Sequence, residues 1–211
     1  MSLLDFLFPP RADELVLRSV SDDEFLALMA PRLVPETRPG TVALLPFHNA
    51  SVRATIHEAK YHGSGRAFRL LGSVLADYLR DADDIRETRF NLVTRLNLVA
   101  LVPIPLGKER LKERGFNQAE EVAKRAVQES GIKIEIDLLI RTRETISQIS
   151  LAREKREENM HGAFGTTRHA DPSYIYIVID DVLTTGATLQ SAINALREAG
   201  AEHVIPIALA H

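Results

Sequence analysis

The sequence predicts an α/β protein with a mainly parallel central sheet flanked by helices. The first indication is the run of β-branched and aromatic residues from Tyr174 to Ile179, which is typical of a strand buried on both faces of a parallel sheet. The second is the alternation of such apolar runs with segments of helical spacing along the chain. The third is the composition, with 45% apolar and 26% charged residues among 211, which are ordinary values for a globular protein.

The first 40 residues are expected to form a small helical N-terminal appendage. The stretch from Ser21 to Glu24 has the pattern of a capping box, and it would open a helix through Phe25 and Met29. A connector rich in proline follows and ends at Gly40. A length of 211 residues favours one main domain, which we assign to residues 41–211.

The elements of the main domain follow from apolar runs and helical periodicity. Strands are expected at residues 41–47, 98–102, 132–137, 174–179 and 203–210. Helices are expected at residues 51–61, 67–80 and 117–130, and a further helix should begin after residue 188 and end near Gly200. The polar segment 81–95 is expected to be an exposed loop.

Composition also limits the compartment and the partners. The formal net charge of −3 gives the whole chain no general attraction to nucleic acid or to an anionic membrane. The chain has no cysteine, which excludes disulfides and thiolate zinc sites and is consistent with a cytoplasmic location. The apolar stretch in the opening MSLLDFLFPP is too short for a signal peptide or a membrane span, and no basic region precedes it.

The most informative segment is the end of the 174–179 strand together with the turn that follows it. Asp180 and Asp181 should lie at the carboxyl end of the strand, where open α/β sheets bind ligands. The next turn leads into a helix N-terminus, whose free N–H groups and dipole favour a phosphate. The turn residues assigned to a 5-phosphate are Thr184, Thr185, Gly186, Ala187 and Thr188.

The two acids suit a different part of the ligand, because carboxylates repel a phosphate. Sugar hydroxyls, a Mg²⁺ ion or a cationic transition state are their natural partners. A phosphate beside a polyol indicates ribose 5-phosphate. The alternative is an ordinary strand–loop–helix in which acids and threonines only cap the helix.

A second polar segment, residues 102–120, directly follows the 98–102 strand. It is expected to be a basic loop between two glycines, and arginine forks in it would match the oxygens of a pyrophosphate. The residues assigned to pyrophosphate binding are Pro105, Lys108, Arg110 and Arg114. The alternative is a solvated basic turn balanced by Glu109 and Glu113.

A third segment, residues 141–164, has little apolar content and is expected to form a mobile flap that excludes water from a reactive sugar cation. The flap would present Arg143, Gln148, Arg153 and Arg156. A surface helix over residues 151–158 with interspersed charges fits the same pattern.

These segments resemble a known family. VIDDVLTTGAT resembles the phosphoribosyl pyrophosphate (PRPP) motif of the type I phosphoribosyltransferases. PIPLGKERLKERGFNQ, RTRETISQISLAREKREENMHGAF and DDVLTTGAT occur in the order seen in ComF-type phosphoribosyltransferase-like proteins, which are linked to bacterial competence and DNA uptake. HEAKYHGSGR and the opening LLDFLFPPR are similar to further segments of that family, so the resemblance covers most of the chain from about residue 45.

The resemblance implies a type I phosphoribosyltransferase fold and a Mg²⁺-dependent glycosyl transfer from PRPP, with release of pyrophosphate. Asp180 and Asp181 would bind the ribose hydroxyls, stabilise the cationic centre and contact the Mg²⁺, either directly or through PRPP. The family usually carries a four-cysteine zinc module after its opening, and this chain has no cysteine, so we expect no zinc site.

The sequence does not identify the acceptor, because no residue stands out as one that would bind a nucleobase. A nucleobase-like or other small acceptor is one expectation. A non-catalytic PRPP or nucleotide regulator, or an adaptor that binds single-stranded DNA or a protein of the competence machinery, is the other. A homodimer is a further expectation, and no membrane partner is expected.

Overall fold

In the computed structural model of the protein, the described residues are 10–35, 37, 40–80, 98–143, 160 and 162–211. Six strands form the central sheet in the order β1-β2-β8-β7-β3-β4. Their bounds are β1 Arg32–Val34, β2 Thr41–Leu45, β8 His203–Ala210, β7 Ile175–Val182, β3 Val99–Pro103 and β4 Lys133–Ile134. All neighbours pair in parallel except β1, which is antiparallel to β2. The predicted mainly parallel α/β class is therefore confirmed.

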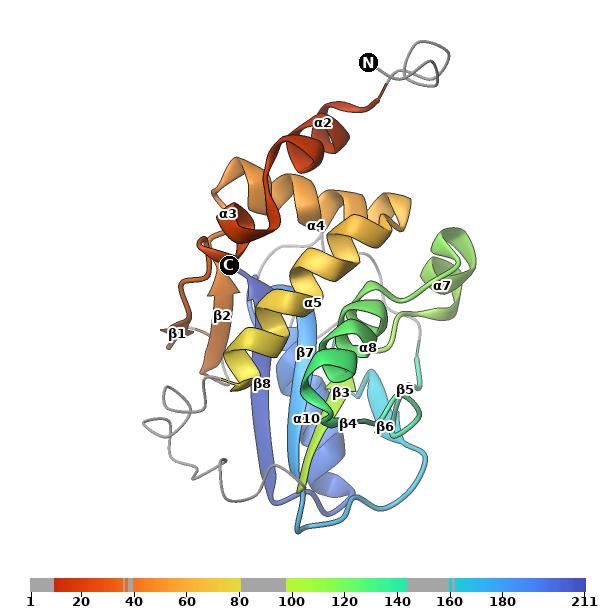
Figure 1. Cartoon of the computed structure of the whole chain (residues 1–211). Helices are drawn as coiled ribbons and strands as arrows, with labels where there is room; N and C mark the ends of the chain where they lie inside the picture. The colour runs from red at the N-terminus through yellow and green to blue at the C-terminus, as the bar shows by residue number, and fades with distance from the viewer. Residues whose placement is uncertain (1–9, 36, 38–39, 81–97, 144–159, 161) are drawn as a thin grey trace.

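Helices cover both faces of this sheet. Figure 1 shows α4 (Ala50–His62), α5 (Gly65–Arg80) and α8 (Gln118–Ser130) on the near side, and α10 (Ala187–Glu198) behind. Successive residues of β7 point to opposite faces. Ile177 and Ile179 therefore join the core cluster under α4, α5 and α8, whereas Tyr176 and Val178 join the cluster under α10. Residues on both faces of β7 are therefore buried, which explains why the sequence of this strand is a continuous apolar run.

A second, two-stranded sheet lies at the base of the segment expected to form a flap. β5 (Leu139–Arg141) pairs antiparallel with β6 (Phe164–Thr166), and Arg141 is opposite Phe164. The two strands bring the ends of the 141–164 segment together. Most of the segment between them, residues 144–159 and 161, lies outside the described residues, so its action as a flap stays a prediction.

The N-terminal segment packs against the main domain. It forms α2 (Ala12–Ser19), α3 (Asp22–Leu26) and β1, and the capping box at Ser21 is confirmed. Leu17 and Phe25 are 2% and 0% exposed and belong to the core cluster under α4 and α5. The boundary near residue 40 stays a prediction, but residues before it share one core with residues after it.

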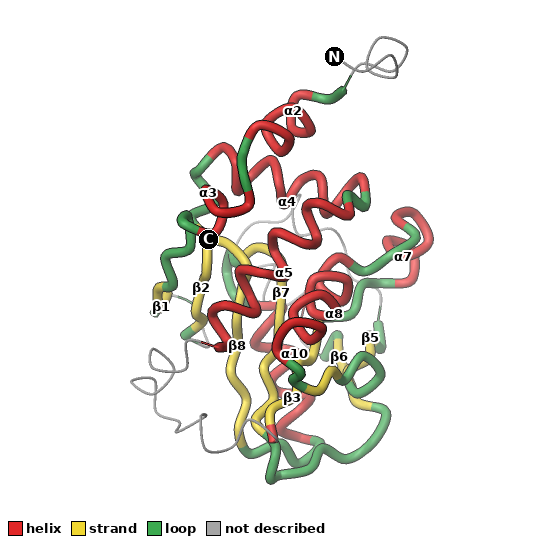
Figure 2. The backbone as a smooth tube through the Cα atoms, viewed as in Figure 1, coloured by secondary structure: helices red, strands yellow, loops and turns green. Residues whose placement is uncertain are grey.

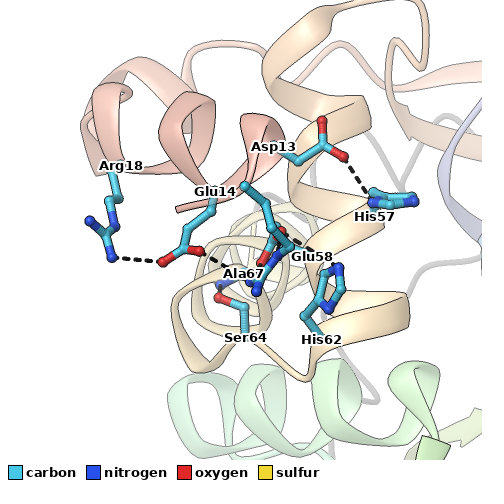
Figure 3. Close-up of polar contacts among 9 residues, drawn as sticks. Asp13, Glu14, Arg18, His57, Glu58, His62, Ser64 and Ala67 are labelled. Carbon is cyan, nitrogen blue, oxygen red and sulfur yellow. Dashed lines mark hydrogen bonds and ion pairs between the residues drawn. The ribbon is translucent and has the colours of Figure 1, made fainter. Parts of the chain in front are cut away.

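Ion pairs hold α2 against α4, as Figure 3 shows. The guanidinium of Arg11 donates to both carboxylate oxygens of Glu58, at 3.0 and 2.7 Å. The side chain of Glu58 is only 1% exposed, so this charge requires a close partner. Asp13 and His57 form a second pair between the helices, with 2.8 Å between Oδ2 and Nδ1. Helix α4 is thus fixed from its outer side.

Two expectations about local structure are wrong. The basic loop is a helix, α7 (Lys108–Arg114), which ends at Gly115 in a left-handed conformation with φ of 79°. Lysine, glutamate, arginine and leucine are good helix formers, and their charge concealed the short helix between the two glycines. The strand expected at 132–137 is confined to β4, and Ile136 is 42% exposed in the turn that follows.

Two other features bear on earlier expectations. The polar segment 81–95 lies outside the described residues. Among the helices of the described ranges, none is both long and apolar enough to cross a membrane.

The contact between α5 and α8 predicts a large effect of a small substitution. A Cβ at Gly72 would lie 2.5 Å from the Cβ of Arg125 on α8. Gly72→Ala should therefore lower the free energy of unfolding by about 1–3 kcal/mol, as measured by urea denaturation, because the two helices must separate. Gly65→Ala is the control, since nothing lies within 4 Å of a Cβ there. Equal stability of the two variants would contradict the close helix contact.

Candidate functional site

The carboxyl ends of β2, β3 and β7 meet at one edge of the sheet, where a cavity of about 420 Å³ opens beneath α4 and beside α7. Figure 2 shows the strands of the sheet connected by loops to the surrounding helices. Three of these connections, β2 to α4, β3 to α7 and β7 to α10, contribute to the cavity wall. Its charged and amide side chains are those of Arg53, Lys60, Arg110, Arg114, Gln118, Arg141, Asp180 and Asp181.

The structure brings together residues from all three segments singled out in the sequence, and the residues assigned a role come from two of them. The predicted residues that line the cavity are Pro105, Arg110, Arg114, Asp180, Asp181, Thr184, Gly186 and Thr188. Thr185 and Ala187 belong to the same turn but are not part of the lining. Lys108 and Arg143 are exposed and also lie outside the lining. Gln148, Arg153 and Arg156 lie outside the described residues.

The turn after β7 has the features of an anion site. Gly186 adopts a left-handed conformation with φ of 79° and serves as the N-cap of α10, and Thr185 Oγ1 accepts from the N–H of Ala187 at 3.4 Å. No acidic residue occupies the first turn of this helix. The backbone N–H groups of this first turn, together with the helix dipole, favour an anion. Thr184 and Thr188 add hydroxyl groups to the lining.

The two acids of β7 are not equivalent, because consecutive residues of a strand point to opposite faces. Asp181 lies on the face of α4 and α8. Its Oδ2 accepts a hydrogen bond from Gln118 Nε2 at 2.7 Å and pairs with Lys60 Nζ at 3.0 Å. Its Oδ1 accepts from the N–H of Val182 at 2.7 Å. Asp181 is thereby fixed in orientation and matched by a positive charge.

Asp180 lies on the opposite face of β7, towards α10 and β5. Its Oδ1 accepts from the N–H of Asp181 at 2.9 Å. Burial, followed by the charge of Asp181, raises the pKa of Asp180 to about 7, although Lys60 and Arg141 oppose the rise. Because Asp180 keeps partial exposure to the cavity, water there limits the effect. The carboxyl of Asp180, with this pKa, changes its charge near neutral pH.

A chain of polar contacts links the acids to the basic helix. Arg114 Nη1 donates to Gln118 Oε1 at 2.9 Å, and the amide of Gln118 in turn donates to Asp181. The guanidinium of Arg114 also lies over the ring of Tyr61, 5.3 Å from its centroid. The cationic side of the cavity and its acidic side are therefore held in a fixed relation by neutral and aromatic groups.

Several cavity residues were not assigned a role from the sequence. Lys60 and Tyr61 occur in HEAKYHGSGR, Gln118 is the last residue of PIPLGKERLKERGFNQ, and Arg141 opens the flap segment. Each of these therefore lay within a recognised motif, but nothing in the sequence alone connected it with Asp181. Arg53 had no such signal, because it is one exposed arginine on an amphipathic helix.

Five cationic side chains line the cavity, namely Arg53, Lys60, Arg110, Arg114 and Arg141, against the two acids. Such an excess favours a ligand with several negative charges. Within the described ranges, no three or more His, Cys, Asp or Glu side chains are grouped so that they could hold a metal ion. A metal at Asp180 and Asp181 would therefore need further ligands from a bound molecule or from water.

Comparison with known proteins places the sequence beside the competence proteins. Competence protein ComFC of Bacillus subtilis is 30% identical over 155 residues, which are 72% of this chain and 56% of that protein. Competence protein F of Haemophilus influenzae is 30% identical over 107 residues, which are 50% of this chain and 47% of that protein. The chain spans about half the length of the curated relatives that it matches. No protein-family model matches the chain.

Among solved structures, the glutamine PRPP amidotransferase from B. subtilis complexed with ADP and GMP is similar over 72% of this chain and 30% of that one. The TM-score is 0.41 and the sequence identity is 18%, which is too distant to carry an argument about the site. The sequence relationship is stronger and agrees with the resemblance of the three motifs. Over about half of their length, the chain is thus a homologue of the bacterial proteins named competence protein F and ComFC.

Proposed function

We propose that this protein binds PRPP and transfers its 5-phosphoribosyl group to a small acceptor, with release of pyrophosphate. The observation that carries the proposal is the convergence of three groups in one cavity: the paired acids of β7, the turn that begins α10, and the arginines of α7. Each group alone has an ordinary structural explanation. Together they provide one site for sugar hydroxyls between two sites for anions, and PRPP has a ribose between a phosphate and a pyrophosphate.

The two ends of PRPP would occupy opposite sides of the cavity. The 5-phosphate fits the turn from Thr184 to Thr188, where backbone N–H groups and hydroxyls meet a helix N-terminus. The pyrophosphate fits Arg110 and Arg114, whose side chains enter the cavity from α7. The ribose would then lie over the end of β7, with its hydroxyls donating to Asp180.

The acids also fit a Mg²⁺ ion that arrives with the substrate. Magnesium prefers oxygen ligands in an octahedron and usually retains water and phosphate ligands. Asp180 would hold it, directly or through the ribose hydroxyls, and Asp181 would support Asp180 from the neighbouring position. When bound, the ion would neutralise charge on the pyrophosphate and make it a better leaving group.

In the transfer step, the bond between ribose C1 and the pyrophosphate oxygen breaks, and its electron pair leaves with the pyrophosphate. The acceptor forms the new bond to C1 and loses a proton. Arg110 and Arg114 would bind the charge that gathers on the leaving group. The carboxylate of Asp180 would stabilise the positive charge that develops on the sugar.

A second candidate function is a non-catalytic regulator or adaptor in DNA uptake. The names of the relatives, which are competence proteins, favour it. So does the exposed ring of Tyr61 beside Arg114, since aromatic and basic side chains together suit single-stranded nucleic acid. Transfer activity predicts pyrophosphate release from PRPP with one of a set of bases. An adaptor predicts binding without turnover, or binding of single-stranded DNA that weakens as salt rises.

The first prediction concerns ribose binding. PRPP with Mg²⁺ should raise the melting temperature of the protein, and the double substitution Asp180→Asn, Asp181→Asn should abolish the rise, because the ribose hydroxyls lose their acceptors. The measurement is a thermal shift titration with PRPP, followed by a pyrophosphate-release assay with candidate bases. An undiminished rise of the melting temperature in the double variant would show that the two acids do not bind the ribose.

The second prediction separates the two anion sites. Arg110→Ala with Arg114→Ala should weaken pyrophosphate binding about tenfold or more, and should change the binding of ribose 5-phosphate little. Lys112→Ala is the matched control, because this residue lies on the same helix but outside the cavity lining. Isothermal calorimetry with each ligand makes the comparison, and equal losses for both ligands would contradict the assignment.

The third prediction concerns pH. A carboxyl with a raised pKa keeps its proton in the folded protein while the unfolded chain loses it, so its contribution to stability is lost as pH rises from about 4 towards 7. Asp180→Asn removes this loss. The variant should therefore gain stability relative to the wild type by at least about 1 kcal/mol between pH 5 and pH 8, as measured by urea denaturation.

Asp171→Asn is the control for this pH dependence. Hydrogen bonds from Ser173 hold the pKa of Asp171 below its usual value, so this carboxylate stabilises the fold above that pKa and ceases to do so in acid. Both protonation changes, in the folded and in the unfolded chain, lie below the range from pH 5 to pH 8, so the Asp171 variant should keep a constant difference in stability from the wild type across that range. A gain with rising pH in the Asp171 variant equal to that of the Asp180 variant would count against the environment assigned to Asp180.

A further inference from the structure

Lys60 occupies a distinctive position in the cavity. Its ammonium comes from α4 and lies 3.0 Å from Asp181 Oδ2, the same oxygen that accepts from Gln118. The lysine side chain is only 25% exposed, and that of Asp181 is 11% exposed. This ion pair is therefore much less screened by water than a surface pair.

The helix that carries Lys60 has little freedom to move the ammonium away. Glu58, two residues earlier, is buried and held by Arg11 of the N-terminal segment. Ala59 is 2% exposed in the core, and Asn49 and Gly63 cap the two ends of α4. The pair between Lys60 and Asp181 is thus set by a helix fixed at both ends and on its outer side.

Asp180 and Asp181 lie on opposite faces of β7, but both line the cavity. Carboxylate oxygens are preferred ligands of Mg²⁺ and Mn²⁺, so without a counter-charge these acids would attract a divalent cation. An ammonium 3.0 Å from one of these oxygens supplies the positive charge that the acids require, and it repels a second cation at close range. Arg141, which approaches from β5, also acts on the charge of Asp180.

We propose that Lys60 is the resident counter-cation of the acids at the end of β7, and that it prevents the free protein from binding a divalent cation there. The inference rests on the proposed function, in which the metal ion belongs to the substrate complex. Its consequence is an order of binding: the ion enters with PRPP, whose phosphates supply the ligands and the negative charge that the free protein lacks. Lys60 is a positioning residue in this account, since it acts on the acids.

The test measures metal binding in the absence of PRPP. Mn²⁺ is titrated into the protein and followed by electron paramagnetic resonance of the free ion. The wild type should bind Mn²⁺ weakly or not at all, whereas Lys60→Met should bind one ion at least about tenfold more tightly. Lys60→Arg, which retains the charge, should behave as the wild type. Addition of Asp181→Asn to Lys60→Met should remove the gain.

A matched control distinguishes this site from a general effect of unpaired acids. Lys124 on α8 also pairs with two neighbouring carboxylates, those of Glu120 and Glu121, at 2.7 and 3.0 Å. Lys124→Met should not produce a comparable Mn²⁺ site, because this pair lies on a helix surface open to water. An equal gain in the Lys124 variant would overturn the proposal, as would a wild type that binds Mn²⁺ as tightly as Lys60→Met.

Two further measurements keep the outcome clear. If Lys60→Met does not fold, as judged by its melting transition, Lys60→Gln replaces it, and failure of that variant to gain Mn²⁺ affinity overturns the proposal. PRPP binding by the wild type is measured in parallel. A wild type that excludes Mn²⁺ but binds no PRPP refutes the proposed function alone, whereas one that binds PRPP and also binds free Mn²⁺ refutes the role of Lys60 alone.

Discussion

The carboxylates of Asp180 and Asp181, on consecutive residues at the carboxyl end of the buried strand β7, repel each other, and the contacts around β7 reduce this repulsion. The strand itself separates the two carboxylates by directing them to opposite faces of the sheet. Lys60 and Gln118 then bind Asp181. Within the part of the chain that the structure describes, the hydrogen bond to Asp180 comes from the backbone N–H of Asp181, and burial raises the pKa of Asp180. Asp181 therefore already has two side-chain partners, and Asp180 is the acid that we propose contacts the ligand.

The same constraint explains why distant segments are tied together. α4 carries Lys60 and is itself held by Arg11 through the buried carboxylate of Glu58. α8 carries Gln118, which also receives Arg114 from the short basic helix α7. The N-terminal segment, which contains no cysteine, is thus attached to the cavity wall by ion pairs and by core residues such as Phe25. Stability of the fold and geometry of the site share these contacts.

Much of this architecture was predictable from the sequence. The apolar run of β7, the helical spacing after Thr188, and the order of strands and helices gave the parallel sheet, and the position of Asp180 and Asp181 at a strand end followed. Local patterns do not report long-range pairs, however. The contact of Lys60 with Asp181 joins residues 121 positions apart, and the sequence contains no local signal for it. The short helix α7 was missed because its charges indicated a solvated loop, although its residues favour a helix.

The proposed function requires one cavity to bind both anionic ends of PRPP, with the ribose over the end of β7. A crystal structure of the protein with PRPP and Mg²⁺ tests this arrangement. We expect the 5-phosphate in the turn from Thr184 to Thr188, the pyrophosphate against Arg110 and Arg114, and the ribose hydroxyls at Asp180. A PRPP molecule bound elsewhere on the protein, or bound with its two ends exchanged, would contradict it.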